Sequence, residues 1–249
     1  MLKNKNKTSG KKSPRNKKSY ILDEDSAFMI VEAYKKFRTN LQFVLSQSDK
    51  KSFIITSPMP DEGKSTVALN TGIVFSQLGK RVMIIDADMR KPTVYKKLGL
   101  TNHVGLSSVL GNFNDLSEAI KPFRENIDVI TSGPIPPTPS EMLSSKRMDD
   151  ILKRLEQAYD VIILDTPPIN MVADALSLSD KVGGAVLVVR ERSTKYEAVK
   201  KALAAIDDIG MKLFGTVING SRNSIGKLGY RNRYYYSYNY AYKASPSNK

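Results

Sequence analysis

The chain has 249 residues and carries 39 Lys and Arg against 25 Asp and Glu, a formal net charge of +14. It contains no Cys, which excludes disulfides and Cys-ligated metal sites. No apolar run approaches the ~20 residues of a membrane-spanning helix, and the first 20 residues lack the apolar region of a signal peptide, so we expect the chain not to cross a membrane by itself.

Residues 1–22 are predicted to form a flexible basic arm. The first 20 residues contain eight Lys or Arg and no acid. One interpretation is a solvated tail; the other is attraction to an anionic membrane surface, worth on the order of 1 kcal/mol per basic residue. The block has no interleaved aromatic residues for base stacking, which argues against nucleic-acid binding.

A helix is predicted to begin near Asp25 or Ser26, since either residue can cap its N-terminus. Its apolar positions recur every three or four residues and form one stripe: Ile30, Tyr34, Phe37, Leu41, Val44 and Leu45. A charged flank lies beside the stripe and contains Glu32, Lys35 and Arg38.

Strands and helices then alternate along the chain. The predicted strands cover 52–57, 81–86, 127–131, 161–165, 185–189 and 213–219, and the predicted helices cover 63–78, 146–159 and 195–209. This alternation is typical of an α/β fold with a mainly parallel sheet and helices on both faces. Binding sites in such sheets lie at the carboxyl ends of the strands.

The strongest local signal is T-S-P-M-P-D-E-G-K-S-T, residues 56–66, between a predicted strand and a predicted helix. This is the context of a P-loop, which makes the fold P-loop NTPase-like. Backbone N–H groups and the positive end of the helix bind phosphate oxygens. The predicted nucleotide-binding residues are Glu62, Gly63, Lys64, Ser65 and Thr66. Lys64 would reach the β- and γ-phosphates of ATP, and the Ser65 hydroxyl would ligate Mg²⁺.

Two residues depart from the usual P-loop pattern. Pro58 replaces the first Gly, and Asp61 stands where a related subgroup has Gly. If that position requires a positive φ, Asp costs roughly 1–2 kcal/mol there. Its carboxylate would also repel phosphate unless it points outward, so we expect a reduced nucleotide affinity.

Three acidic residues follow predicted strands. Asp86 and Asp88 come at the end of one strand, and Asp165 ends another. In a parallel sheet these ends converge near the Lys64 loop. Asp88 and Asp165 are candidates to hold Mg²⁺ or its waters, and Asp86 is a candidate to accept a proton from an incoming hydroxyl. Asn219 ends a further strand and is a candidate either for contact with the base or for a turn.

Residues 222–249 are predicted to be a disordered tail, which leaves 23–221 as the folded domain. No aliphatic residue larger than Ala is available within 230–242 to build a core. Seven tyrosines lie there: Tyr230, Tyr234, Tyr235, Tyr236, Tyr238, Tyr240 and Tyr242.

Together these motifs resemble the bacterial tyrosine kinases of capsular and exopolysaccharide biosynthesis. The resemblance covers roughly residues 26–242. It includes the P-loop, I-I-D-A-D-M-R, V-I-I-L-D-T-P-P, the loop S-G-P-I-P-P-T-P-S-E-M-L, the helix E-A-Y-K-K-F-R-T-N and the tyrosine cluster. It implies Mg-ATP-dependent autophosphorylation of the cluster, with Asp86 activating the hydroxyl and Asp88 and Asp165 serving Mg²⁺.

The resemblance also implies partners. It predicts a ring-like homo-oligomer in which one subunit's tail enters a neighbour's site, through a motif matched by Glu32, Lys35 and Arg38. Lys35 stands where Arg is usual and lacks its planar bidentate geometry. Without a membrane span, the chain resembles the split form of the family. That form works with a transmembrane activator, a polysaccharide co-polymerase, and implies a cognate tyrosine phosphatase and a cytoplasmic location at the inner face of the membrane.

Two other functions remain open, beside the weaker alternative of a nucleic-acid-binding protein that acts through the basic arm. A partition or positioning ATPase of the same superfamily would have an extra Lys five residues before Lys64, where this chain has Met59. That function also leaves the tyrosine tail unexplained. A non-catalytic adaptor, in which ATP only controls assembly, is compatible with the sequence, and Asp61 favours it.

Overall fold

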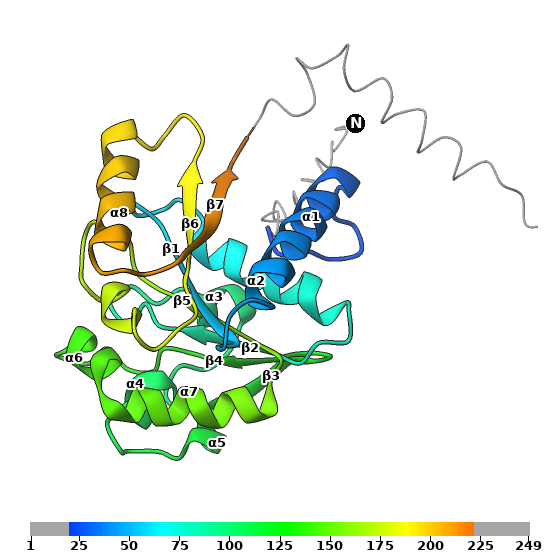
Figure 1. The fold of residues 1–249 in the computed structure, drawn as a ribbon. Helices are drawn as coiled ribbons and strands as arrows, with labels where there is room; N and C mark the ends of the chain where they lie inside the picture. The colour runs from blue at the N-terminus through cyan, green and yellow to red at the C-terminus, as the bar shows by residue number, and fades with distance from the viewer. Residues whose placement is uncertain (1–19, 222–249) are drawn as a thin grey trace, which may run out of the picture.

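A seven-stranded sheet forms the centre of residues 20–221, the part of the chain that the computed structural model describes (Figure 1). Its order is β3-β4-β2-β5-β1-β6-β7. The strands are β1 Ser52–Thr56, β2 Val82–Asp86, β3 Ile120–Arg124, β4 Ile127–Ile130, β5 Val161–Asp165, β6 Ala185–Arg190 and β7 Leu213–Asn219. Only β3 and β4 pair antiparallel. The predicted mainly parallel sheet is confirmed.

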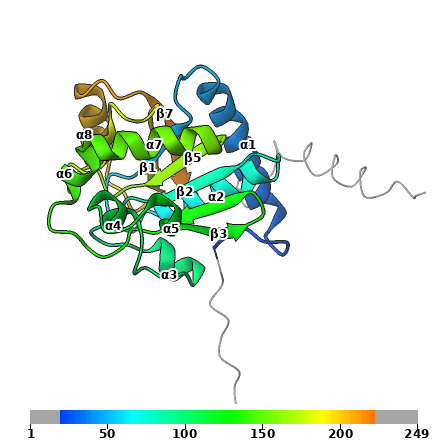
Figure 2. The ribbon, with the colours of Figure 1, turned by 90° about the horizontal axis from the view of Figure 1, so that it is seen from below.

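Helices cover both faces of this sheet (Figures 1 and 2). They are α1 Phe28–Leu45, α2 Lys64–Ser76, α3 Val94–Leu98, α4 Leu106–Leu110, α5 Leu116–Ala119, α6 Pro139–Ser144, α7 Lys146–Ala158, the 3₁₀ helix Leu176–Leu178 and α8 Tyr196–Asp208. The α2 helix packs on one face with α1 outside it, and α7 packs on the other face. The helices predicted at 63–78, 146–159 and 195–209 are confirmed to within two residues at each end.

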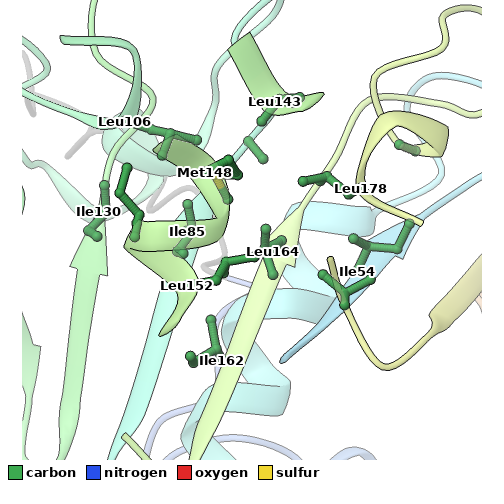
Figure 3. Packing of buried hydrophobic residues seen from close by; sticks show 14 of the residues in the cluster. Ile54, Ile85, Leu106, Ile130, Leu143, Met148, Leu152, Ile162, Leu164 and Leu178 are labelled. Atoms are coloured by element: carbon green, nitrogen blue, oxygen red, sulfur yellow. The ribbon is translucent and has the colours of Figure 1, made fainter. Parts of the chain in front are cut away.

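The central strands are apolar along their whole length because both of their faces are covered. In β5, for example, Ile162 and Leu164 pack in the cluster that contains Met148 and Leu152 of α7 (Figure 3). The intervening Ile163 points to the other face and packs in the cluster with α2. These two apolar layers hold the carboxyl ends of β1, β2 and β5 side by side.

The N-terminal helix differs from its prediction in two ways. Its N-cap position is Ala27, while the Ser26 hydroxyl donates to Asp23, so the predicted caps were wrong. Ile30 is 51% exposed although it belongs to the predicted stripe, and Leu41 is the buried member. The reason is that α1 packs mainly on α2 in an outer layer, where a helix buries only part of its apolar face.

Several short elements between β2 and α7 were not predicted. The edge strand β3 is partly exposed and contains Pro122, which is tolerated on an edge because no inner ladder bond is lost. The α6 helix begins at Pro139, within the segment expected to be a loop, and Pro suits that first helical position. Such elements are too short to show a period in sequence.

A strap formed by residues 20–22 binds the domain. The Leu22 side chain is 4% exposed, and its N–H donates to Asn70 Oδ1 at 2.8 Å. Asn70 Nδ2 donates to the Tyr20 carbonyl at 3.0 Å, and Arg124 donates to the Leu22 carbonyl at 2.8 Å. The end of the predicted basic arm therefore packs on α2. Residues 1–19 and 222–249 lie outside the described residues, so the predictions of a flexible basic arm and a disordered tail stay predictions there. Within 20–221 no helix is long and apolar enough to span a membrane.

Replacing Asn70 tests the strap. We expect Asn70→Ala to lower the free energy of unfolding by about 2 kcal/mol, because the buried Leu22 N–H and the partly buried Tyr20 carbonyl lose their partner. Urea denaturation measures this change. The control is Asn114→Ala, whose side chain makes an exposed bond to Glu118 and should change stability by less than about 0.5 kcal/mol. Equal effects of the two variants would contradict the assignment.

Candidate functional site

The predicted P-loop lines a pocket of about 480 Å³ at the carboxyl ends of the parallel strands. It brings Gly63, Lys64, Ser65 and Thr66 together, and α2 begins at Lys64. Two features require glycine at position 63: its φ is +96°, and a Cβ there would lie 2.1 Å from Asn219 Nδ2. The first turn of α2 therefore presents its unpaired N–H groups and positive end to the pocket.

Asp61 occupies the left-handed backbone region. Its φ is +61°, so the position does impose the predicted strain. Its carboxylate is 83% exposed and lies 3.9 Å from the Lys91 ammonium group. The charge thus points to solvent and a cation, which reduces its repulsion of a phosphate.

The three predicted acids converge as expected. Asp86 and Asp165 are register partners in the β2–β5 pairing, and both are fully buried. Asp88 lines the pocket directly, while Asp86 lies behind it and accepts a hydrogen bond from the Val94 N–H at 3.1 Å. Within the described part of the chain, Asp86 Oδ1 and both carboxylate oxygens of Asp165 make no hydrogen bond.

Burial dominates the electrostatics of these carboxyl groups. It raises the pKa of Asp86 well above its usual range, and the neighbouring Asp165 adds to the effect. Burial raises the pKa of Asp165 to about 6, although the Lys64 ammonium and the nearby Ser65 hydroxyl act in the opposite direction. Burial also raises the pKa of Asp88, while the hydrogen bond that Asp88 accepts from the Lys91 N–H acts in the opposite direction.

Unpaired buried carboxylate oxygens beside a P-loop lysine fit a divalent cation. In residues 20–221, no three His, Asp or Glu side chains are grouped so as to enclose a metal ion. Mg²⁺ commonly takes one or two carboxylates and completes its shell with phosphates and water. Ser65, Asp88 and Asp165 meet that description.

Four further cations line the pocket: Arg90, Lys91, Lys97 and Arg190. These four residues were not predicted as site residues, although Arg90 follows the two acids after β2 and Arg190 ends β6. Arg90 is fixed by the fully buried Asp174, to which it donates two bonds of 2.9 Å. Ser140 also donates to Asp174, at 2.5 Å. This bidentate pair ties the loop after β2 to the loop after β5.

Glu62 and Asn219 lie beside the P-loop but do not line the pocket. The Glu62 side chain is 3% exposed and accepts a hydrogen bond from Thr194 Oγ1 at 2.5 Å. Asn219 Nδ2 donates to the Glu62 carbonyl oxygen at 2.8 Å. Asn219 therefore contacts the P-loop itself, and its predicted contact with a base remains a prediction.

The residues predicted to form an oligomer interface make contacts within the chain. Lys35 pairs with Glu32 at 2.9 Å on α1, and both side chains are partly exposed. Arg38 donates to the Val74 carbonyl at 2.6 Å and holds α1 on α2. All seven predicted acceptor tyrosines lie outside the described residues.

Comparison with known sequences gives a consistent group of relatives. An AAA domain family model matches residues 61–213. The chain is 46% identical over 194 residues to the tyrosine-protein kinase YwqD of Bacillus subtilis, covering 78% of this chain and 82% of that protein. It is 37% identical over 220 residues to the putative tyrosine-protein kinase CapB of Staphylococcus aureus, covering 88% and 94%. It is 33% identical to the tyrosine-protein kinase Wzc of Salmonella typhimurium, of which it spans only 29%.

Solved structures that resemble this chain include proteins of the same group. The chimerical protein CapA2B2 matches with a TM-score of 0.75 and 39% identity, covering 78% of this chain and 86% of that one. The kinase domain of Escherichia coli ETK matches with a TM-score of 0.74 and 34% identity, covering 76% and 75%. The septum site-determining protein MinD of Pyrococcus horikoshii, at 22% identity and a TM-score of 0.58, shares the fold.

The burial of Asp165 predicts that this carboxylate lowers the stability of the folded protein at alkaline pH. In metal-free protein we expect Asp165→Asn to raise the free energy of unfolding at pH 8 by ~1–3 kcal/mol. The folded wild type must there ionise a group whose pKa is about 6, well above its value in the unfolded chain. This destabilisation of the wild type grows as pH rises through 6.

At pH 4 the folded wild type already carries the proton, so the advantage of Asp165→Asn should vanish. Denaturation curves in the presence of a chelator at pH 4 and pH 8 measure both values. Asp160→Asn, a change at an acid before β5, is the control. A variant that is less stable than wild type at pH 8 would contradict the electrostatic assignment.

Proposed function

Since the chain belongs to the bacterial tyrosine kinases of capsular and exopolysaccharide systems, we propose that it uses ATP to phosphorylate the tyrosines of its own C-terminal cluster and thereby regulates polysaccharide synthesis and export. The observation that carries this proposal is the convergence of Asp86, Asp88 and Asp165 beside Lys64. One or two of these carboxylates suffice for Mg²⁺, which leaves Asp86 as a candidate proton acceptor.

The residues have distinct roles in this reaction. Lys64 and the N–H groups at the start of α2 bind the β- and γ-phosphates. Arg90 and Lys91 at the pocket edge offset negative charge that develops on the transferred group. Ser65, Asp88 and Asp165 would hold Mg²⁺, which would neutralise part of the phosphate charge.

Asp86 is the proposed base. Asp86 lies behind the pocket lining, so this role requires that its free Oδ1 become reachable for a tyrosine hydroxyl when the acceptor enters; the pKa raised by burial makes the ionised form of Asp86 a stronger proton acceptor than an exposed Asp. The tyrosine oxygen then bonds to the γ-phosphorus as the bond to the β-phosphate oxygen breaks, and ADP leaves.

The acceptor comes from a neighbouring chain in this proposal. The cluster Tyr230–Tyr242 would enter the pocket of another copy in a ring-like oligomer assembled through Glu32, Lys35 and Arg38. Because the side chains of Glu32 and Lys35 are partly exposed, each could exchange its ion pair within the chain for one with a neighbouring subunit. A transmembrane activator of the polysaccharide co-polymerase type would complete the nucleotide site, and the left-handed Asp61 supports the need for such help.

Charge distribution supports a position at the inner face of the membrane. Residues 20–221 contain 25 basic and 25 acidic residues, so the excess of +14 lies in residues 1–19 and 222–249. Both basic ends would be attracted to anionic lipids. A cognate phosphatase would reset the tail, because each phosphate adds roughly −1.5 to −2 charges.

The rival switch-type ATPase receives less support. Met59 occupies the place of its additional lysine, and the matched kinase domains are more similar to this chain than MinD is. A non-catalytic adaptor would bind ATP without transferring phosphate, which the following measurement separates.

We expect Asp86→Asn to lower the rate of tail phosphorylation by a factor of about 10²–10⁴, because the proton acceptor is lost. Its affinity for MgADP, measured by calorimetry, should stay within about threefold of wild type, since Asp86 does not line the pocket. Mass spectrometry after incubation with Mg-ATP and the activator's cytoplasmic segment reads out phosphotyrosine. Lys64→Met is the matched control and should lose both binding and transfer. No phosphotyrosine in wild type under any condition would favour the adaptor.

Phosphorylation should dissociate the oligomer, because several phosphates reverse the charge of a tail that is basic before modification. Light scattering is expected to give a larger mass for unphosphorylated than for phosphorylated wild type. Lys64→Met incubated with Mg-ATP should keep the larger mass. Equal masses before and after phosphorylation would refute the charge argument.

A further inference from the structure

The P-loop is held by three side chains from the end of β6, the turn after β6 and the end of β7, of which only Arg190 also lines the pocket. Arg190 donates to the Asp61 carbonyl at 3.0 Å, and Asn219 donates to the Glu62 carbonyl at 2.8 Å. Thr194 donates to the Glu62 carboxylate at 2.5 Å. None of these contacts is within the loop itself, so the strained segment depends on a distant part of the chain.

The direction of the Thr194 bond follows from its neighbours. Thr194 lies in the turn between β6 and α8, where its hydroxyl oxygen accepts the Arg190 N–H at 3.0 Å. A hydroxyl has one proton to give, and the buried Glu62 oxygen is the shortest acceptor available to it. The same Thr194 therefore connects the Arg190 backbone with the Glu62 side chain.

These contacts decide which groups of the loop face a phosphate. Asp61 and Gly63 both have positive φ, and Glu62 between them is buried. With the Asp61 and Glu62 carbonyls bound to side-chain donors, the N–H groups of the loop are left for an anion. A peptide that turned over would instead direct a carbonyl oxygen, or the Glu62 carboxylate, toward the phosphates.

We propose that Thr194 and Asn219 are positioning residues for nucleotide binding: through Glu62 they hold the P-loop with its N–H groups toward the pocket. The inference rests on the proposed use of ATP. It assigns Asn219 a role that needs no contact with a base, and it explains how a loop with Asp at a left-handed position keeps a binding conformation.

Thr194→Val tests this role because it keeps the shape and removes the hydroxyl. Its dissociation constant for MgADP, measured by calorimetry on the full chain, should rise about tenfold or more, while the phosphorylation rate at saturating ATP stays within about twofold. Hydrogen exchange at the amides of residues 61–65 should become faster. Thr194→Ser should restore wild-type binding, and Thr216→Val, at an exposed threonine of β7, should leave it unchanged.

The link through Glu62 is tested by combination. In a Glu62→Ala background, Thr194→Val should produce no further loss of affinity, because its partner is already absent. Asn219→Ala should weaken binding independently and also speed exchange. Unchanged affinity in Thr194→Val, or the same loss with and without Glu62, would overturn the proposal. Binding and exchange are read without phosphorylation, so a wild type that binds MgADP but transfers no phosphate would contradict the proposed kinase function alone.

Discussion

The register between β2 and β5 places two buried carboxylates directly opposite each other beside the P-loop lysine. The adjacent Asp86 and Asp165 are costly to ionise, and the strands that carry them are held by apolar layers on both faces of the sheet. The rest of the site depends on this constraint. Lys64 lies within electrostatic reach of Asp165 and Asp88, and the loop after β2 brings Asp88 and Arg90 to the pocket edge.

The pocket is consequently a strained and charged region on a rigid frame. Its loops are tied by side-chain hydrogen bonds in addition to their apolar contacts: Arg90 binds Asp174, and Asn219 binds Glu62. Such ties fix the direction of donors and charges at the point of reaction, which is the arrangement that phosphoryl transfer requires. Each of these hydrogen bonds also joins segments that lie far apart in the sequence.

The sequence predicted the elements whose pattern is long or strongly apolar. The strands β1, β2 and β5 are continuous apolar runs, α7 and α8 have a clear helical period, and α2 was placed by the P-loop that precedes it. The three acids follow known strand-end chemistry. It did not predict α3 to α6 or β3, which are too short to show a period. It missed the N-cap at Ala27, because Ser26 is the better capping residue by type but its hydroxyl donates to Asp23 instead. Arg190 and Thr194 were missed for another reason: their partners lie about 130 residues away, and only the folded sheet brings them to the loop.

Complementation between two inactive chains tests the central claim most directly, that a site built around Lys64 on one copy acts on the tyrosine cluster of another. One chain would carry Lys64→Met with an intact tail, and the other would have all seven cluster tyrosines changed to Phe. Mixed with Mg-ATP and the activator's cytoplasmic segment, they should produce phosphotyrosine on the tail of the Lys64→Met chain. Absence of phosphotyrosine in the mixture, under conditions in which the wild type labels its own cluster, would contradict the account.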